Sequence, residues 1–359
     1  MLILSVILSK IAQLSMAKNV FYTFPVYISF VRNDEALLKR HFKVKSFYFK
    51  QNPVKLPFYF VKLFLSLLFN IRKTDIYVSF FAGYSSYLPA IFAKLTKRPH
   101  LIILGGTDCV SFPEMNYGNF RKPFLGYCTR FSIKFATHLA PVDASLRECE
   151  YKYLTDQQRR QGYLEYCNNP TTPFTVINIG YDQNRFYCKE EKLANSFLTV
   201  GQMNKANFLR KGIDLIIFLA NRNPHCNFTI VGDSPGMDYG IVPENVKILP
   251  FVPYEKLREI YATHRFYLQL SIMEGFPSAP CEAMLCECVP IVSSVGALPE
   301  IVGETGFILK VKDKDKLETI IQSALNSDLD FLGKAARNRI ISKFPLQTRN
   351  KLIEVIEQL

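Results

Sequence analysis

The chain has 359 residues, 48% of them hydrophobic, which is too long for one ordinary domain and sufficient for two domains with sizeable cores. Its formal net charge of +13 arises entirely in residues 1–180, because residues 181–359 carry equal numbers of basic and acidic side chains. The nine cysteines show no C-x-x-C pair and no paired histidine spacing, which argues against a disulfide framework or a zinc site and favours reduced thiols in a cytosolic protein.

The first residues are apolar but lack the features of a secretory signal. No basic residue precedes the run Met1–Leu8, and no small-residue cleavage site leads to a plausible mature start. Residues 1–15 are therefore either a helix that touches a membrane or an artefact of start-site choice, since Met16 stands just before the first convincing strand.

The first half of the chain alternates strand-like and helix-like segments. Expected strands are Asn19–Phe24, Lys43–Phe49, Ile76–Phe80, His100–Leu104 and His138–Pro141, and expected helices are Asp34–Arg40, Leu56–Ile71, Ser86–Leu95, Phe120–Phe135 and Ala144–Tyr153. Residues 155–173 are expected to form a loop, and Thr175–Asn178 resembles one further strand. This alternation predicts a parallel sheet covered by helices on both faces.

The segment Leu56–Ile71 is the most apolar part of the chain, yet it falls short of the roughly 20 apolar residues of a spanning helix. It contains Lys62, and its other polar residues form a narrow stripe. Two interpretations remain: a buried helix of the first domain, or a helix that also dips into a lipid interface with its lysines at headgroup level.

The second half begins a new series after a charged, weakly patterned boundary near Asp182–Leu193. Expected strands are Phe197–Val200, Asn227–Val231, Val246–Leu249, Phe266–Leu270, Pro290–Val292 and Gly306–Leu309. A helix is expected to open over Gly212–Leu219, and further helices are expected at Glu255–Thr263, Ala279–Cys288, Ala297–Val302 and Lys314–Leu325. Residues Leu329–Leu359 are expected to be helical with a break at Pro345. The whole pattern predicts an α/β protein with two doubly wound domains and a ligand-binding cleft between their strand ends.

The basic first half suggests an anionic partner. Nucleic acid and an anionic membrane leaflet are the candidates, and simple solubility is the third explanation. No nucleic-acid-binding motif is present, so we expect a membrane surface and no nucleic acid.

Two glutamates mark the turn that follows the strand Phe266–Leu270. Glu274 lies in the turn and Glu282 lies in the first turn of a helix that begins near Ser278, with seven residues between them. Turns at the carboxyl ends of strands bind ligands in open α/β sheets, helix-start amides bind anions, and carboxylates accept hydrogen bonds from sugar hydroxyls. This loop therefore suits a sugar joined to a nucleoside by a diphosphate.

Further motifs follow one another through the second half. They are Val200-Gly201-Gln202, Arg210-Lys211-Gly212, Val231-Gly232-Asp233, Pro250-Phe251-Val252, the Glu274–Glu282 loop, and Val295-Gly296 with Gly303-Glu304-Thr305-Gly306. In this order and spacing the chain resembles a retaining GT-B glycosyltransferase of family 4 (glycosyl transferases group 1) over roughly residues 196–310, and more weakly over residues 19–180. The resemblance implies two Rossmann-like domains, residues 1–185 on the acceptor side and 186–340 for the nucleotide sugar, with a helix in 341–359 that returns to the first domain.

The resemblance also implies roles for residues that bind the donor. Arg210 and Lys211 would hold the diphosphate, although Gln202 stands where many relatives have an arginine. Glu282 would bind the ribose and Glu274 the transferred sugar. Backbone amides of the loop would bind the sugar and phosphate at Gly275, Phe276, Pro277 and Ser278, except that Pro277 itself has no N–H. Val252 would lie beside the base. Gly232 and Asp233 would also border the donor, but they fit plain turn residues equally well.

The first domain departs further from the family pattern. Gly105 stands where relatives often have a histidine close to the transferred sugar, followed by Gly106. Asp108 is either a group that binds a donor or acceptor hydroxyl or the residue that closes an Asx turn or caps a helix. Tyr27 lies in the loop after the first strand, on the expected acceptor side, and this loop lacks the Gly-Gly of many relatives.

The implied reaction transfers a sugar from a nucleoside diphosphate, UDP- or GDP-linked, to an acceptor hydroxyl with retention of configuration. The expected setting is cell-surface polysaccharide, lipopolysaccharide or glycolipid synthesis by a cytoplasmic protein on the inner face of a membrane. We expect no cofactor and no metal, because the Asp-x-Asp pairs Asp313–Asp315 and Asp328–Asp330 lie away from the cleft. The alternatives are a non-catalytic binder of sugar nucleotides and an epimerase or phosphorylase on the same scaffold.

Overall fold

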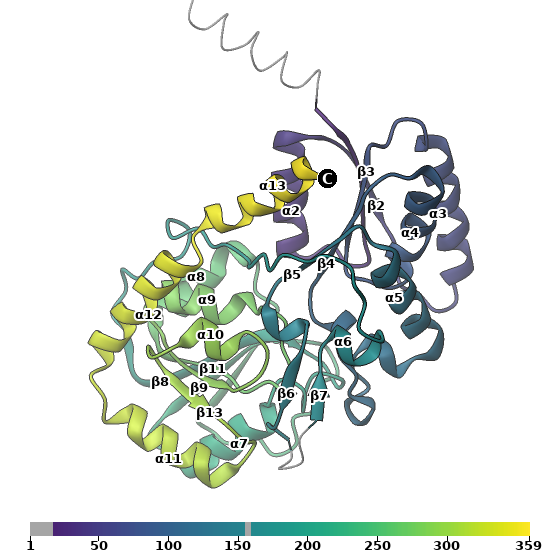
Figure 1. The fold of residues 1–359 in the computed structure, drawn as a ribbon. Helices are drawn as coiled ribbons and strands as arrows, with labels where there is room; N and C mark the ends of the chain where they lie inside the picture. The colour runs from purple at the N-terminus through teal and green to yellow at the C-terminus, as the bar shows by residue number, and fades with distance from the viewer. Residues whose placement is uncertain (1–16, 155–158) are drawn as a thin grey trace, which may run out of the picture.

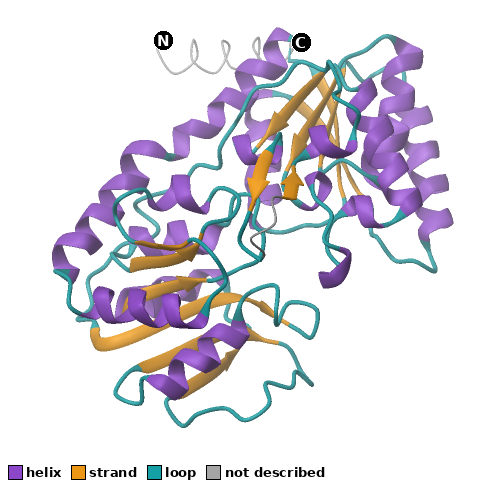
Figure 2. Cartoon of the chain, turned by 60° about the horizontal axis from the view of Figure 1, so that its bottom comes forward, coloured by secondary structure: helices purple, strands orange, loops and turns teal. Residues whose placement is uncertain are grey.

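The computed structural model describes residues 17–154 and 159–359, and its two parallel β-sheets confirm the expected α/β fold with two Rossmann-like domains. Each sheet is flanked by helices, and the carboxyl ends of the strands of the two sheets point toward the region where the domains meet (Figures 1 and 2). The hypotheses about residues 1–15 fall outside the described residues.

The first sheet has five parallel strands in the order β2-β1-β3-β4-β5. Its strands are β1 (Asn19–Phe24), β2 (Lys43–Tyr48), β3 (Ile76–Phe80), β4 (His100–Leu104) and β5 (His138–Pro141), and its main helices are α2 (Ser29–His41), α3 (Leu56–Asn70), α4 (Tyr84–Thr96) and α5 (Pro123–Phe135). Every residue of β3 and β4 is buried. This continuous burial explains their unbroken apolar runs, since a parallel sheet is covered on both faces.

The second sheet has six parallel strands in the order β10-β9-β8-β11-β12-β13. Its strands are β8 (Leu193–Met203), β9 (Asn227–Asp233), β10 (Val246–Pro250), β11 (His264–Gln269), β12 (Val289–Ser293) and β13 (Phe307–Leu309), and its helices are α7 (Ile213–Arg222), α8 (Leu257–Thr263), α9 (Ser278–Leu285), α10 (Leu298–Val302) and α11 (Lys314–Leu325). The strand order reverses between β8 and β11. Such a switch point opens a crevice beyond the carboxyl ends of the two strands.

One predicted helix, Ala144–Tyr153, is wrong. A short 3-10 turn at Ala144–Leu146 leads into β6 (Cys149–Tyr151), which pairs antiparallel with β7 (Arg159–Gln161). Tyr151 and Tyr153 are buried and the residues between and before them are exposed, an alternation of period two that belongs to a strand. The expected loop 155–173 also contains β7 and the short helix α6 (Tyr163–Tyr166). Thr175–Asn178 runs beside β5 and bonds to it through the amides of Thr175 and Ile177, but it is not a strand of the sheet.

The carboxyl-terminal segment leaves the second domain and returns to the first. It comprises α12 (Leu329–Lys343), a break after Pro345, and α13 (Lys351–Gln358), which lies beside α2 (Figure 1). The guanidinium of Arg349 donates from Nε and Nη2 to the two carboxylate oxygens of Asp34 in α2, at 2.8 and 2.6 Å, and from Nη1 to the carbonyl of Ile177 at 2.7 Å. Both ion-pair partners are buried, so this contact fixes the returning chain to the first domain.

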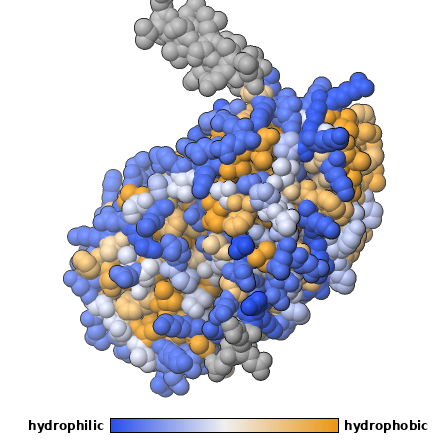
Figure 3. Space-filling view, viewed as in Figure 1, coloured by the Kyte–Doolittle hydropathy of each residue, from blue (hydrophilic) through white to orange (hydrophobic). Residues whose placement is uncertain are grey.

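The helix α3 is not buried, so the first of its two interpretations is wrong. Only Leu63 and Leu67 are buried, while Phe58, Val61 and Phe69 are 62%, 59% and 79% exposed. Figure 3 shows hydrophobic residues gathered on the side of the first domain where α3 lies. Within residues 17–154 and 159–359, no helix is both long and apolar enough to cross a membrane.

Candidate active site

Loops from both domains meet at the carboxyl ends of β4 and β11. The loop after β4 contains Gly105 and Gly106, and the loop after β11 contains Gly275. A Cβ atom on Gly275 would lie 2.0 Å from the carbonyl oxygen of Gly105 and 3.2 Å from the Cα of Gly106. Only glycine permits this approach of two backbones, so the two domains touch directly through these loops.

A lysine and a glutamate form an ion pair at the switch point of the second sheet. Lys211 follows β8 and donates from Nζ to Oε1 of Glu274, which follows β11, at 2.6 Å. The same oxygen accepts hydrogen bonds from Ser271 Oγ at 2.8 Å and Gln269 Nε2 at 3.0 Å. Burial raises the pKa of Glu274, but the charges of Lys211 and Arg210 and these hydrogen bonds outweigh it and lower the pKa below its usual value. Glu274 is therefore an ionised, fixed carboxylate.

Arg210 lies beside this pair and reaches across the cleft. Its Nε and Nη2 donate to Oδ1 of Asn207 at 3.0 and 2.9 Å. Its guanidinium also lies 4.9 Å from the ring centroid of Tyr117, which belongs to the first domain. The carbonyl of Arg210 accepts a hydrogen bond from the amide of Ile272 at 2.8 Å, which ties the cationic loop to the loop of Glu274. Two adjacent cations are thus held at one place between the domains.

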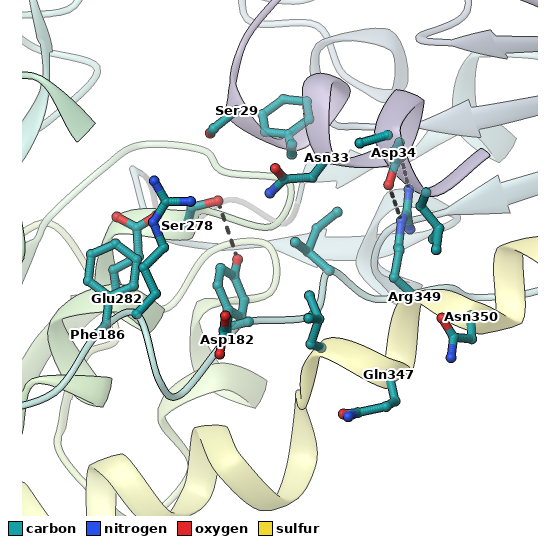
Figure 4. Close-up of a pocket in the computed structure, with 18 of the residues that line it drawn as sticks. Ser29, Asn33, Asp34, Asp182, Phe186, Ser278, Glu282, Gln347, Arg349 and Asn350 are labelled. Atoms are coloured by element: carbon teal, nitrogen blue, oxygen red, sulfur yellow. Dashed lines mark hydrogen bonds and ion pairs between the residues drawn. The ribbon is translucent and has the colours of Figure 1, made fainter. Parts of the chain in front are cut away.

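Glu282 lines a cavity of about 440 Å³ between the two domains. It lies in the second turn of α9, whereas the sequence predicted the first turn, and it is 4% exposed. Tyr261 donates from its hydroxyl to Oε2 of Glu282 at 3.1 Å. Other lining residues are Ser278, Tyr254 and Arg185 on the side of the second domain, Ser29 and Asn33 from α2, and Tyr181, which donates to Ser278 Oγ at 3.4 Å (Figure 4). The guanidinium of Arg185 lies 4.1 Å from the ring centroid of Tyr254. The cavity therefore combines an acid, hydroxyls, an aromatic ring and a cation.

The protonation of Glu282 should make stability depend on pH. Burial raises its pKa to about 7, opposed by the hydroxyls of Tyr261 and Tyr254 and by Arg185, whereas the ordinary value is 4.5. Between these values the folded protein holds the proton more tightly than the unfolded chain, so the free energy of unfolding falls as pH rises from about 4.5 to about 7. This group should contribute a loss of roughly 3 kcal/mol over that interval.

Urea unfolding of Glu282→Gln at about pH 5 and about pH 7.5 checks this expectation, because the substitution should flatten the pH dependence. Glu259→Gln, on the exposed side of α8, is the matched control and should keep the dependence of the unmodified protein. An unchanged slope in Glu282→Gln would show that Glu282 does not titrate in this range.

Asp108 does not present a free carboxylate to the cleft, and this favours the structural alternative over a contact with a donor or acceptor hydroxyl. It is fully buried, and its carboxylate accepts hydrogen bonds from the amides of Ala82, Gly105 and Gly106 at 2.9, 3.1 and 2.9 Å. Burial raises its pKa to about 6, opposed by these amides. Asp108 holds the Gly105–Gly106 loop through amides that precede it in the chain, which is not the Asx turn that was expected, and it is a positioning residue.

The absence of a histidine at Gly105 has a steric reason. A Cβ at Gly105 would lie 2.4 Å from Cε1 of Phe81, whose ring occupies the place of a larger side chain. Phe81 has a φ of +66°, a conformation that is uncommon for a residue other than glycine. Phe81, which directly follows β3, therefore places an aromatic ring in the space that a histidine side chain at position 105 would need.

The remaining predicted residues occupy several environments. Gly232, with a φ of +105°, leaves no room for a side chain beside the carbonyl of Gly201, and Asp233 accepts a hydrogen bond from Tyr239 at 2.8 Å. These two residues are the last of β9. Tyr27 is 49% exposed and donates to Glu35 at 2.7 Å. Val252 is half-buried, Pro277 precedes the first residue of α9, and the ring of Phe276 packs against Phe344 and Tyr181.

Sequence reasoning missed several residues that hold the site together. Asn207 orients Arg210 from three positions earlier, and Gln269 and Ser271 fix Glu274 from the end of β11. Their polar character at the end of a buried strand was a usable signal, because such residues need partners. Tyr254 and Arg185 carried no signal, since their meeting at the cavity depends on the packing of the two domains.

The second domain matches a known protein family. Residues 184–343 match the model of the family described as glycosyl transferases group 1. This range contains the whole second sheet, Arg210, Lys211, Glu274 and Glu282, and α12. The family match therefore covers the half of the protein in which the ion pair and the glutamate of the cavity lie.

Curated relatives match parts of the chain. The gpi3 subunit of phosphatidylinositol N-acetylglucosaminyltransferase from Schizosaccharomyces pombe is 25% identical over 183 residues, which are 48% of this chain and 40% of that protein. O-antigen chain mannosyltransferase B from Escherichia coli is 35% identical over 83 residues, 23% of this chain and 22% of that protein. The chain spans less than half the length of these relatives.

Solved structures match nearly the whole chain. Sucrose-phosphate synthase from Thermosynechococcus elongatus has a TM-score of 0.72 at 15% identity, covering 95% of this chain and 98% of that one. HepE from Anabaena, solved in complex with UDP-glucose, has a TM-score of 0.68 at 14% identity, covering 95% and 100%. At this identity the likeness shows the fold, which is the GT-B arrangement of two Rossmann-like domains. The family match adds that residues 184–343 are similar to the glycosyl transferases group 1.

Proposed function

We propose that this protein transfers a sugar from a nucleoside-diphosphate sugar to an acceptor hydroxyl, with retention of configuration, as retaining family 4 glycosyltransferases do. One observation carries the proposal: Arg210, Lys211 and Glu274 converge at the switch point of the second sheet, and the loop that contains Glu274 leads directly into α9, where Glu282 lines the cavity. Cations and acids arranged in this way match a ligand with a diphosphate between two hydroxyl-bearing groups.

The two cations would bind the diphosphate. Arg210 uses Nε and one Nη2 hydrogen on Asn207, which leaves its Nη1 hydrogens for a phosphate oxygen, and Lys211 has further hydrogens besides the one it donates to Glu274. As the sugar–oxygen bond breaks, negative charge grows on the departing diphosphate. Preorganised cations stabilise this charge, which is the main catalytic requirement of the reaction, and in our proposal they do so without a divalent metal.

The nucleoside would occupy the cavity beside α9. Glu282 would accept hydrogen bonds from the ribose hydroxyls, and the amides of Gly275, Phe276 and Ser278 would bind the sugar and phosphate oxygens. Tyr254, with Arg185 on its ring, and the half-buried Val252 would lie near the base. We favour a UDP sugar for the first trial, because HepE, a structural neighbour, was solved with UDP-glucose.

The acceptor would attack from the face that the diphosphate leaves, and a leaving phosphate oxygen would take its proton. Glu274 accepts three hydrogen bonds on one oxygen and Asp108 is buried under backbone amides, so neither carboxylate is disposed to act as a covalent nucleophile. Retention in our proposal therefore follows from attack on the same face and does not involve a glycosyl-enzyme intermediate.

The names of the relatives suggest the acceptor. One names phosphatidylinositol and the other names the O-antigen chain, so we propose a lipid-linked or cell-surface saccharide acceptor. The protein would then act in polysaccharide, lipopolysaccharide or glycolipid synthesis, bound peripherally to the cytoplasmic face of a membrane.

A donor-hydrolysis assay tests the proposal. Incubation with UDP-glucose, UDP-N-acetylglucosamine and GDP-mannose should release nucleotide slowly from one of them without acceptor, and the freed sugar should have the anomeric configuration of the donor when followed by NMR. Binding without release would instead identify a non-catalytic sugar-nucleotide protein. Conversion of the sugar while it stays attached would identify an epimerase, and phosphate-dependent release of a sugar phosphate would identify a phosphorylase.

A further inference from the structure

An apolar surface lies on the side of the first domain away from its sheet. It consists of exposed residues of α3 and its neighbours, and we call it the α3 face: Val54, Phe58, Val61, Phe64, Leu65, Leu68, Phe69 and Phe124. Phe124, at the start of α5, joins this surface through Phe60, since the two ring centroids are 6.5 Å apart. Eight large apolar side chains in one place exceed the scattered exposure that is normal for a soluble protein.

The helix itself shows that this exposure is not incidental. A helix that is hydrophobic on all sides is normally buried in protein or lipid, because water on either side is unfavourable. In α3 only Leu63 and Leu67 are buried, and Lys62 is the only charged residue within its bounds. The protein core therefore uses one narrow side of α3, and the larger apolar side needs another environment.

Cations surround the α3 face. Lys50 and Lys55 precede the helix, Lys62 lies within it, and Arg72 and Lys73 follow it, all exposed. In the described part of the chain, none of these five side chains forms an ion pair. Residues 36–107 contain twelve lysines and arginines but one acidic residue, Asp75, whose carboxylate is bound by Asn19. The surface is therefore both apolar and strongly positive.

We propose that the α3 face docks on an anionic lipid membrane. The phenylalanines and leucines would enter the boundary between headgroups and acyl chains, and the lysines would keep their ammonium groups at headgroup level. A second copy of this chain fits less well, because a symmetric contact would bring together two copies of the same basic surface. Charge complementarity thus favours an anionic lipid as the occupant.

This docking would place the cleft close to the membrane surface. The α3 face borders the starts of α3, α4 and α5, where Phe124 also contacts Tyr84, and these helix starts follow the carboxyl ends of the strands. The chain segment that leads to Phe124 contains Tyr117, whose ring contacts Arg210 in the cleft. A lipid-linked acceptor could then reach the donor without leaving the membrane. This last step rests on the proposed function, whereas docking itself does not.

Flotation of the full-length protein with liposomes tests the docking surface. Vesicles with about one third phosphatidylglycerol in phosphatidylcholine should bind the protein at low salt, and pure phosphatidylcholine should bind it much more weakly. The variant Phe58→Gln/Val61→Gln/Phe69→Gln should bind at least tenfold more weakly, since it removes apolar contacts. Lys55→Gln/Lys62→Gln/Lys73→Gln should weaken binding on the order of 100-fold, because each cation near an anionic surface contributes about fivefold.

Matched controls come from the second domain. Phe331→Gln removes a side chain that is 67% exposed in α12, and Lys343→Gln removes an exposed lysine of the same helix, so neither should alter liposome binding. Liposome binding that the α3 variants leave unchanged would overturn the proposal. The proposal would also be overturned if the protein does not bind liposomes but self-associates in solution, and the apolar variant abolishes that self-association. The α3 variants should still release nucleotide from the donor without acceptor, so failure of docking and failure of the proposed function give different results.

Discussion

Replacing Lys211 with alanine should lower kcat by roughly 100- to 1000-fold. The ammonium lies 2.6 Å from Glu274 at the switch point, where it would stabilise the charge that develops on the departing diphosphate. Removal of one such preorganised donor typically costs about 3–4 kcal/mol of transition-state stabilisation. Steady-state transfer or donor hydrolysis measures the effect, and kcat should fall more than KM rises because the interaction strengthens as the bond breaks.

Loss of Lys211 also leaves the buried Glu274 without its cation, so stability must be measured in the same experiment. Lys211→Ala/Glu274→Gln should recover much of the stability lost by Lys211→Ala, since it removes the unpaired charge, but it should not recover turnover. Arg222→Ala, at the exposed end of α7, is a control that should leave both unchanged. Activity that returns with the restored stability would show that Lys211 is structural only.

Replacing Arg349 with methionine should lower the free energy of unfolding by about 3–5 kcal/mol. The substitution leaves the carboxylate of Asp34 buried and unpaired, and the loss of one partner of a buried pair is strongly destabilising. It also removes the bond to the carbonyl of Ile177, so the carboxyl-terminal segment loses its tie to both α2 and the chain near the domain boundary. Urea unfolding measures the loss.

The double variant Arg349→Met/Asp34→Asn should recover part of that stability, because no buried charge remains. Lys351→Met, two residues away on an exposed position, should have little effect. Since Asp34 and Arg349 both line the cavity of Glu282, we expect weaker donor binding in the single variant under conditions where it is folded. A loss of less than about 1 kcal/mol in Arg349→Met would contradict the assigned role of the pair.

The fold could be predicted largely from sequence because its signals are local. The buried strands β3 and β4 have unbroken apolar runs, and α11 was predicted with the bounds it has in the structure. The helix predicted over Ala144–Tyr153 was wrong because the strand pattern there consists of only two alternating tyrosines, and the neighbouring residues favour a helix. Its strand is stabilised by a distant contact, since Tyr151 donates to the carbonyl of Ile272 in the second domain at 2.9 Å.

The site was predictable only in part, for a similar reason. Glu274 and Lys211 lie in recognisable turns after strands, and the parallel topology brings such turns together. The direction of a side chain within a turn is not encoded so simply. Asp108 follows a strand of the first sheet as Glu274 follows one of the second, yet its carboxylate binds its own loop. The contact of Arg210 with Tyr117 depends on how the two domains meet, which no local pattern specifies.

In the proposed function, the protein binds a nucleoside diphosphate through the cations of one loop and the acid of the next. Calorimetric titration of the full chain with UDP, GDP and ADP tests it most directly, with Glu282→Ala and Arg210→Ala as the variants. We expect one of these nucleotides to bind with one molecule per chain, and each substitution should weaken its affinity at least tenfold. Binding of none of them, or an affinity that both substitutions leave unchanged, would contradict it.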